Sequence, residues 1–137
     1  MEYDQQFSAT YPLNGEWSVS YEYVNSGGIK IVDGPHLIYV FNTAANKDSV
    51  WIQDQIKHNA LNFAPYQFKA NANMSDFTFT SKNSPDISND DICTVKNGKI
   101  VNKDSIYFEI NFKVKDPNTT YKVYGHRRNS YDEYMNP

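Results

Sequence analysis

The sequence contains little of what several classes of protein require. Cys93 is the only cysteine among 137 residues, which excludes an internal disulfide and a cysteine-based zinc cluster. No apolar run approaches the ~18 residues of a membrane-spanning helix, and none resembles a signal peptide. The formal net charge is −3 with both signs scattered along the chain. We therefore expect neither a nucleic-acid-binding stripe nor a polybasic membrane patch.

Metal-binding and catalytic motifs are also missing. His36, His58 and His126 are widely spaced, and none has a cysteine or histidine partner at ligand spacing. No Gly-x-Ser-x-Gly elbow for a hydrolase nucleophile occurs. The oxygen-rich segment 83–91 lacks the ligand order of a calcium loop, so we expect a solvated loop there. The sequence predicts no metal and no cofactor, and it offers no recognisable catalytic residue.

Aromatic side chains are what the sequence has in abundance. They make up 15% of the chain, with 11 Tyr and 8 Phe, whereas the whole hydrophobic fraction is 39%. This composition favours strands. The pattern is clearest in 13–23, where Trp17, Val19, Tyr21 and Tyr23 share one face and glutamates and serines occupy the other. Strict period-two alternation is typical of a strand with one buried and one wet face.

The rest of the chain repeats this rhythm between turn residues. Asn97-Gly98 predicts a two-residue hairpin turn, 81–91 a polar loop, and 56–63 a loop or a single helical turn. Eight or nine short strands fit either a closed antiparallel barrel or a two-sheet sandwich. Hairpin-length connections and the single cysteine favour an all-β, up-and-down barrel, as one domain over 1–137 with a core at about 13–131. Beyond the first, the predicted strands are 36–43, 50–56, 66–72, 76–80, 92–96, 99–101, 106–115 and 121–128.

Two motifs at the ends of this series resemble those of lipocalin-like (calycin) barrels. They are Gly15-x-Trp17 on the first predicted strand and the segment 121–128 on the last. The resemblance implies that Trp17 plugs one end of the barrel and that an arginine near the last strand lies across its indole. Arg127 matches that arginine, because it faces inward if Tyr121 does. A cation over an aromatic face stabilises by about 0.5–2 kcal/mol.

A narrower resemblance rests on the Leu-x-Gly-x-Trp start, the segment 50–52 and the Tyr-x-x-x-Gly-x-Arg ending. With the chain length, these features resemble a small bacterial family labelled lipid-binding putative hydrolase. The resemblance implies export to the periplasm or cell surface of a Gram-negative bacterium, often with a lipid anchor. The chain shows neither a leader nor a lipidation cysteine at its start, so export is an expectation from the resemblance alone. Membrane contact is expected only through such an anchor.

The lumen of the predicted barrel supplies the candidate ligand-binding residues. Mostly apolar walls with a few hydroxyls suit a fatty or flat hydrophobic ligand whose polar end meets tyrosine hydroxyls. Asp54 shares a face with Val50 and Ile52. It therefore either enters the lumen as a site carboxylate or lies at a rim position in water. The candidates that line or approach the lumen are Tyr21, Tyr23, Tyr39, Trp51, Asp54, Phe79 and Phe108.

Three functions are compatible with these residues. The one we predict is non-catalytic binding of a small hydrophobic ligand, lipid or fatty-acid-like, in the lumen. In the second, the rings fill the lumen and the loops 25–35 and 81–91 contact a protein or glycan. The third is a hydrolase that uses Asp54 and one of the histidines. An internal cavity of several hundred Å³ would favour the first function over the second.

Overall fold

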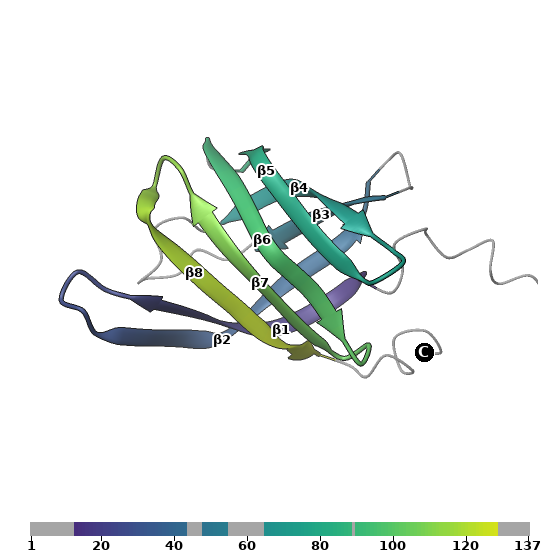
Figure 1. The fold of residues 1–137 in the computed structure, drawn as a ribbon, viewed down its shortest axis with the longest axis horizontal. Helices are drawn as coiled ribbons and strands as arrows, with labels where there is room; N and C mark the ends of the chain where they lie inside the picture. Colours follow the sequence, from purple (N-terminus) through teal and green to yellow (C-terminus); the bar gives the residue numbers. More distant parts are fainter. Residues whose placement is uncertain (1–12, 44–47, 55–64, 89, 129–137) are drawn as a thin grey trace, which may run out of the picture.

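The computed structural model describes residues 13–43, 48–54, 65–88 and 90–128. Each strand pairs antiparallel with the next, and β8 returns to pair with β1, so the sheet closes into a barrel (Figure 1). The predicted all-β, up-and-down barrel is confirmed, with eight strands. They are β1 (Gly15–Val24), β2 (Lys30–Asn42), β3 (Ser49–Asp54), β4 (Tyr66–Asn73), β5 (Thr78–Asp86), β6 (Asp91–Val101), β7 (Ser105–Phe112) and β8 (Asp116–Arg127).

Period-two alternation decides which side chains fill the barrel. Trp17, Val19 and Tyr21 on β1 are buried, while the residues between them lie closer to solvent. The closure of β1 against β8 requires a glycine at position 125. A Cβ atom at Gly125 would lie 1.8 Å from the carbonyl oxygen of Ser18, so any other residue would force the two strands apart. This contact explains the glycine in the Tyr-x-x-x-Gly-x-Arg ending.

The turn predicted at Asn97-Gly98 was wrong. β6 runs straight through these residues, and its register shifts there against both β5 and β7, so the pair forms a β-bulge. The turn between β6 and β7 is made by Asn102 and Lys103, whose φ angles of 53° and 67° are the positive values that a type I′ turn requires. Asn97 has a φ of 56°, a conformation that suits a bulge as well as a turn.

The predicted loop 81–91 was also wrong, because most of it belongs to β5 and β6. The carboxylate of Asp86 accepts backbone N–H bonds from Gln67 and Ser88, each at 2.9 Å. The carboxylate of Asp91 accepts backbone N–H bonds from its own strand and from the β7–β8 turn. These acidic residues therefore fasten neighbouring strands together. The predicted loop or helical turn at 56–63 lies outside the described residues.

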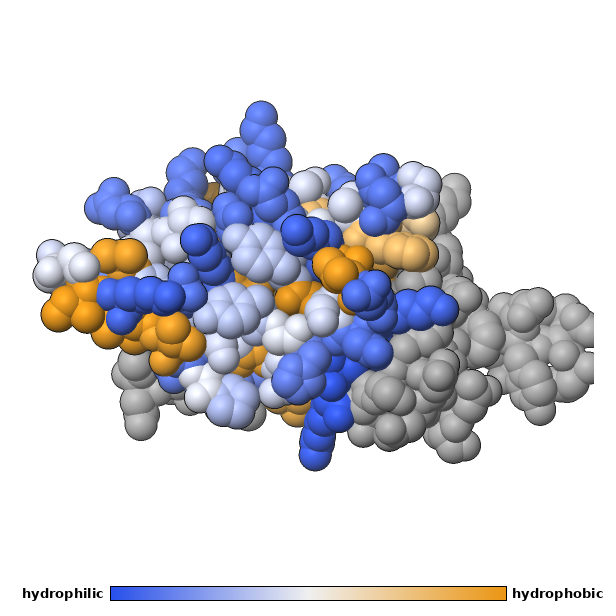
Figure 2. Space-filling model, turned by 60° about the horizontal axis from the view of Figure 1, so that its bottom comes forward, coloured by the Kyte–Doolittle hydropathy of each residue, from blue (hydrophilic) through white to orange (hydrophobic). Residues whose placement is uncertain are grey.

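The barrel has two different ends. The Trp17 end carries the starts of the odd-numbered strands, and the hairpin end carries the β1–β2 hairpin. This hairpin extends beyond the barrel (left in Figure 1), because β8 pairs with β1 only as far as Glu22 and β3 pairs with β2 only from Tyr39 onward. Figure 2 shows apolar surface at its tip. The large exposed hydrophobic residues at the hairpin end are Val24, Ile29, Val32, Ile87 and Val114, and those at the Trp17 end are Phe77 and Val101.

Within the described residues, no helix has the length and apolar character needed to cross a membrane.

Candidate ligand-binding site

The Trp17 end is closed by two side chains that bind backbone carbonyls. Trp17 is fully buried, and its Nε1 donates to the carbonyl oxygen of Leu13 at 3.0 Å. The guanidinium carbon of Arg127 lies 4.2 Å from the centre of the Trp17 ring. The same guanidinium donates to the carbonyl oxygens of Lys103 at 2.7 Å and Asn14 at 2.5 Å. The pair thus fastens the segment before β1 to the β6–β7 turn.

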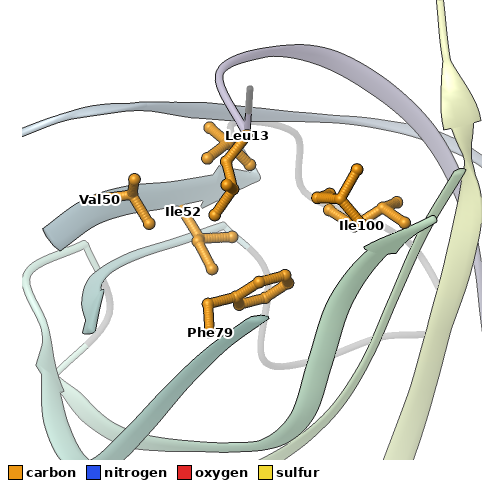
Figure 3. Close-up of a pocket in the computed structure, with 7 residues that line it drawn as sticks. Leu13, Val50, Ile52, Phe79 and Ile100 are labelled. Atoms are coloured by element: carbon orange, nitrogen blue, oxygen red, sulfur yellow. The ribbon is translucent and has the colours of Figure 1, made fainter. Parts of the chain in front are cut away.

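An apolar gap lies inside the barrel next to this end (Figure 3). The space is too narrow to hold a water molecule. Phe79 packs against Phe108 with 5.6 Å between ring centres, and its ring lies against Gly98, where a Cβ would come within 2.6 Å of it. The labelled side chains in Figure 3 converge on this space. The gap is lined by Leu13, Val40, Val50, Ile52, Phe79, Ile100 and Ile106.

A chain of three polar side chains lies farther toward the hairpin end of the lumen. Tyr21, Asp54 and Tyr66 are each fully buried. The Tyr21 hydroxyl donates to Oδ2 of Asp54 at 2.7 Å and lies 2.8 Å from the Tyr66 hydroxyl. Because a tyrosine hydroxyl has only one proton, Tyr66 must be the donor to Tyr21. Tyr66 therefore donates a hydrogen bond to Tyr21, and Tyr21 donates one to Asp54.

Burial is the main reason that the pKa values of Tyr21 and Tyr66 both lie well above the usual 10.0. The negative charge on Asp54 raises both pKa values further. Both hydroxyls therefore remain protonated at neutral pH and remain hydrogen-bond donors. The three hydrogen-bonded side chains therefore form a fixed polar cluster within an apolar lumen.

The polar chain joins residues that the sequence singled out separately. Tyr21 and Asp54 are both predicted lumen residues, and the structure brings them into direct contact. The sequence interpretation missed Tyr66, although its position two residues before Phe68 gives it the same inward parity. Asp54 also lies two residues beyond Ile52, which lines the gap, or about 7 Å along β3. The polar chain and the apolar gap therefore share one wall of the lumen.

Aromatic rings fill much of the lumen near the hairpin end. Tyr23, another predicted lumen residue, is half-buried, and its ring centre lies 5.0 Å from that of Tyr121. Tyr121 packs against Phe112 at 6.2 Å, and Phe112 packs against Tyr66 at 5.5 Å. These rings surround the polar chain with apolar surface. They also leave the described part of the lumen densely packed.

The inward orientation predicted for Tyr39, and the approach to the cavity predicted for Trp51, were wrong. Both lie on the outer face of the barrel, because the inward positions on their strands belong to Val40 and Ile52. Trp51 is half-buried there, with the ammonium group of Lys69 5.0 Å from the centre of its ring. The two aromatic side chains therefore do not line the gap.

One of the three histidines adjoins the polar chain. His36 on β2 is half-buried, with 5.7 Å between its ring centre and that of Tyr21. Its Nε2 lies 3.2 Å from Oδ1 of Asp33. His126 is exposed on β8, and His58 lies outside the described residues. Of the histidines proposed for a hydrolase, only His36 is thus shown near Asp54.

The buried thiol and hydroxyl near this site have structural roles. Burial, together with the carboxylates of Asp86 and Asp91, raises the pKa of the Cys93 thiol far above its usual value, so it is a poor nucleophile. The Ser81 hydroxyl donates to the Cys93 carbonyl at 3.1 Å and accepts from the Val95 N–H at 3.0 Å. It thereby bridges β5 and β6 at a register shift.

A second concave region lies on the outer face of the barrel, over β5, β6 and β7. It is an open, partly polar groove of about 610 Å³. Tyr107 and Asn97 both donate to Oε2 of Glu109, at 2.6 and 3.3 Å, so the polar groups at its floor bind one another. Burial and the bond to Glu109 raise the pKa of Tyr107 to about 12. The groove is lined by Thr78, Thr80, Asn97, Gly98, Lys99, Tyr107 and Glu109.

No cluster of three or more His, Cys, Asp or Glu side chains in the described ranges is arranged to hold a metal ion.

The comparison with protein families agrees with the motifs at the two ends of the chain. A family model described as lipid-binding putative hydrolase matches residues 2–132. The chain belongs to this family. No curated protein matches it. The resemblance inferred from the sequence is thus confirmed, and membership of the lipid-binding putative hydrolase family is consistent with ligand binding by the barrel.

Proposed function

We propose that the protein binds a small lipid-like ligand in the barrel lumen without converting it chemically. The observation that carries this proposal is the fully buried chain Tyr66–Tyr21–Asp54 beside the apolar gap. A buried carboxylate is costly, and an apolar residue of similar size would commonly serve stability as well or better. The polar chain and the apolar gap lie next to each other along the barrel. This arrangement matches a ligand with a polar head and an apolar tail. The description of the family supports the same conclusion.

The ligand enters a lumen that must first open. The gap is too narrow to hold even a water molecule, whereas most small-molecule sites have volumes of roughly 300–1,000 Å³. Phe79 is the bulkiest side chain at the gap, and it packs between Gly98 and Phe108. Rotation of this ring away from Ile52 would extend the gap toward Asp54. The ligand tail then replaces ring contacts with its own apolar contacts, so little apolar surface meets water.

The polar chain favours particular head groups. Asp54 accepts a hydrogen bond from Tyr21 and is the acceptor end of the polar chain. A hydroxyl or amine head group can donate to such an acceptor, whereas a carboxylate head group would add a second acceptor of like charge. We expect long-chain alcohols or amines to bind more tightly than the fatty acids of the same chain length.

Native mass spectrometry of the freshly purified protein, compared with its denatured mass, tests the proposal directly. We expect a bound mass of a few hundred daltons that is lost on denaturation. Fluorescence with a fatty-acid probe should also show saturable binding, displaced more effectively by a fatty alcohol than by the matching acid. A matched pair of variants locates the site: Ala70→Leu places a leucine inside the lumen, and Asn71→Leu places a leucine outside on the same strand.

Ala70→Leu should weaken probe binding about tenfold or more, and Asn71→Leu should leave it unchanged. Circular dichroism and thermal unfolding verify that both variants fold. The proposal fails if the wild-type protein carries no bound mass and shows no response to the probe. It also fails if the two folded leucine variants bind the probe equally well.

The packed lumen favours the second candidate function, a surface interaction module. The gap is too narrow for a water molecule, and aromatic rings occupy the lumen near the polar chain. The loops expected to make the contacts are largely strand, so the groove beside Tyr107 and Glu109 replaces them as the contact surface. Its partly polar lining suits a polar partner such as a glycan. A bare native mass with no probe response would favour this candidate.

A further inference from the structure

We propose that the hairpin end of the barrel docks on the surface of a lipid membrane, with the tip of the β1–β2 hairpin inserted among the lipids. Val24, Ile29 and Val32 are 59%, 61% and 52% exposed, although all three are aliphatic. Single exposed apolar residues are ordinary on a protein surface, but a contiguous group marks an interaction site. These three lie within nine residues of sequence, on a hairpin that extends past the barrel. The proposal goes beyond ligand binding in the lumen and does not depend on it.

The hairpin is built to hold these side chains in a fixed arrangement. Val24 pairs with Lys30, and Glu22 pairs with Val32, so the two valines lie on the same face of the hairpin. The turn between them is closed by Asn25, whose side-chain oxygen accepts the N–H groups of Gly27 at 2.9 Å and Ile29 at 3.0 Å. The Asn25 N–H also donates to the carbonyl oxygen of Ile29 at 2.9 Å. The turn residues thus hydrogen-bond to one another, which lowers the cost of placing Ile29 in an apolar medium.

Two other loops contribute aliphatic side chains to the same end. Ile87, after β5, is 63% exposed, and Val114, between β7 and β8, is 60% exposed. The two exposed hydrophobic residues at the Trp17 end are less exposed, at 37% for Phe77 and 42% for Val101. The apolar surface of the described residues is therefore concentrated at one end of the barrel. A membrane approached from this end would meet the hairpin tip and both loops.

Lysines beside the exposed aliphatic residues favour a lipid surface as the occupant, with Glu22 and Asp116 at the same end of the barrel. The Lys30 side chain is 64% exposed beside the tip, with its ammonium 3.7 Å from Glu22, and Lys113 and Lys115 flank Val114. Cations beside inserted aliphatic residues suit anionic lipid head groups. The hairpin tip projects, and projecting aliphatic side chains suit fluid hydrocarbon. The buried polar chain of the lumen lies toward the same end, so docking there would place the ligand site near a source of lipid.

Vesicle co-sedimentation of the full chain tests this proposal. Vesicles of phosphatidylcholine alone and of phosphatidylcholine mixed with phosphatidylglycerol are the probes. The double variant Val24→Ser/Ile29→Ser removes apolar surface at the tip, and Phe77→Ser/Val101→Ser removes two exposed apolar side chains at the opposite end. We expect the wild-type protein to bind both vesicles, and the mixed ones more tightly. The tip variant should bind at least about tenfold more weakly, and the control variant should bind like the wild type.

Several results would overturn the proposal. The proposal is wrong if the wild-type protein stays wholly in the supernatant, and it is also wrong if the tip and control variants lose binding equally. If the wild-type protein is a dimer without vesicles and the tip variant is a monomer, the tip is an interface between two copies of the chain. Probe binding in vesicle-free solution is measured on the same variants. Loss of vesicle binding with unchanged probe binding separates this proposal from the lumen site.

Discussion

Two groups of buried polar side chains, one at the Trp17 end and one farther toward the hairpin end of the lumen, bind different kinds of partner. At the Trp17 end, Trp17 and Arg127 donate to backbone carbonyls, and the guanidinium stacks on the indole. Every one of these contacts fastens one segment of chain to another. Toward the hairpin end, Tyr66, Tyr21 and Asp54 bind one another in the middle of an apolar lumen. These two hydrogen bonds join side chains to one another. The same end of the barrel exposes aliphatic residues to water.

This difference separates structure from function. Polar groups that satisfy backbone carbonyls stabilise the fold, because those carbonyls would otherwise be buried without a partner. A buried carboxylate that accepts a hydrogen bond from Tyr21, which in turn accepts one from Tyr66, gives the fold little stability that apolar residues could not give. Exposed aliphatic residues likewise contribute little to the stability of the isolated chain. We therefore expect substitutions of Trp17 and Arg127 to affect stability most, and substitutions in the polar chain or at the hairpin tip to affect binding.

The largest effect should come from Trp17→Ala. The substitution creates a cavity in the core, removes the bond to the Leu13 carbonyl and leaves Arg127 without its aromatic partner. We expect a loss of about 3–5 kcal/mol in the free energy of unfolding. Urea unfolding followed by circular dichroism measures it. Trp51→Ala is the matched control, because Trp51 is half-buried on the outer face and should cost only about 1 kcal/mol. Equal losses in both variants would contradict the structural role of the Trp17 end.

The sequence predicted the barrel because alternation is a local signal. In 13–23 the apolar and polar residues alternate without exception through the strand, so both the strand and its buried face can be read directly. The segment 36–43 is apolar on both faces, which is why the orientation of Tyr39 was predicted wrongly. The turn predicted at Asn97-Gly98 was wrong for a related reason. Positive φ at an asparagine suits a turn or a bulge, and only the pairing of β6 with both neighbours decides between them.

The candidate site was only half predictable. The parity of Asp54 with Val50 and Ile52 marked it as a carboxylate on an apolar face. Its partner Tyr21 is 33 residues away, and their contact depends on how far β1, β2 and β3 are staggered in the closed barrel. No periodicity in the sequence gives that stagger. The exposed hairpin tip depends on the same stagger, because it is the part of β1 and β2 that neither β8 nor β3 covers.

Arg127→Lys should have the second-largest effect. Lysine keeps the charge but lacks the planar fork that reaches the Lys103 and Asn14 carbonyls together while stacking on Trp17. We expect a loss of about 1.5–3 kcal/mol in the free energy of unfolding, measured by urea titration. Arg128→Lys on the adjacent residue is the control, because its exposed side chain pairs only with Glu16, and it should cost less than about 0.5 kcal/mol. Similar costs at both positions would remove the distinction between the buried and the exposed arginine.

The smallest effect concerns the hairpin end and depends on pH. The pKa values of Tyr21 and Tyr66 are raised in the folded protein, mainly by burial, so both stay protonated above the usual 10.0. In the unfolded chain the same hydroxyls ionise near pH 10, so the unfolded state then binds fewer protons and stability falls as the pH rises. From pH 9 to pH 11 each tyrosine adds a total of about 1.4 kcal/mol to this loss. Urea unfolding over this range should therefore show a total loss that is smaller by about 1.4 kcal/mol, and hence a shallower slope, in Tyr21→Phe and also in Tyr66→Phe. An unchanged slope in both variants would show that the two hydroxyls do not form the buried chain in solution, and would remove the basis for a polar site at this end.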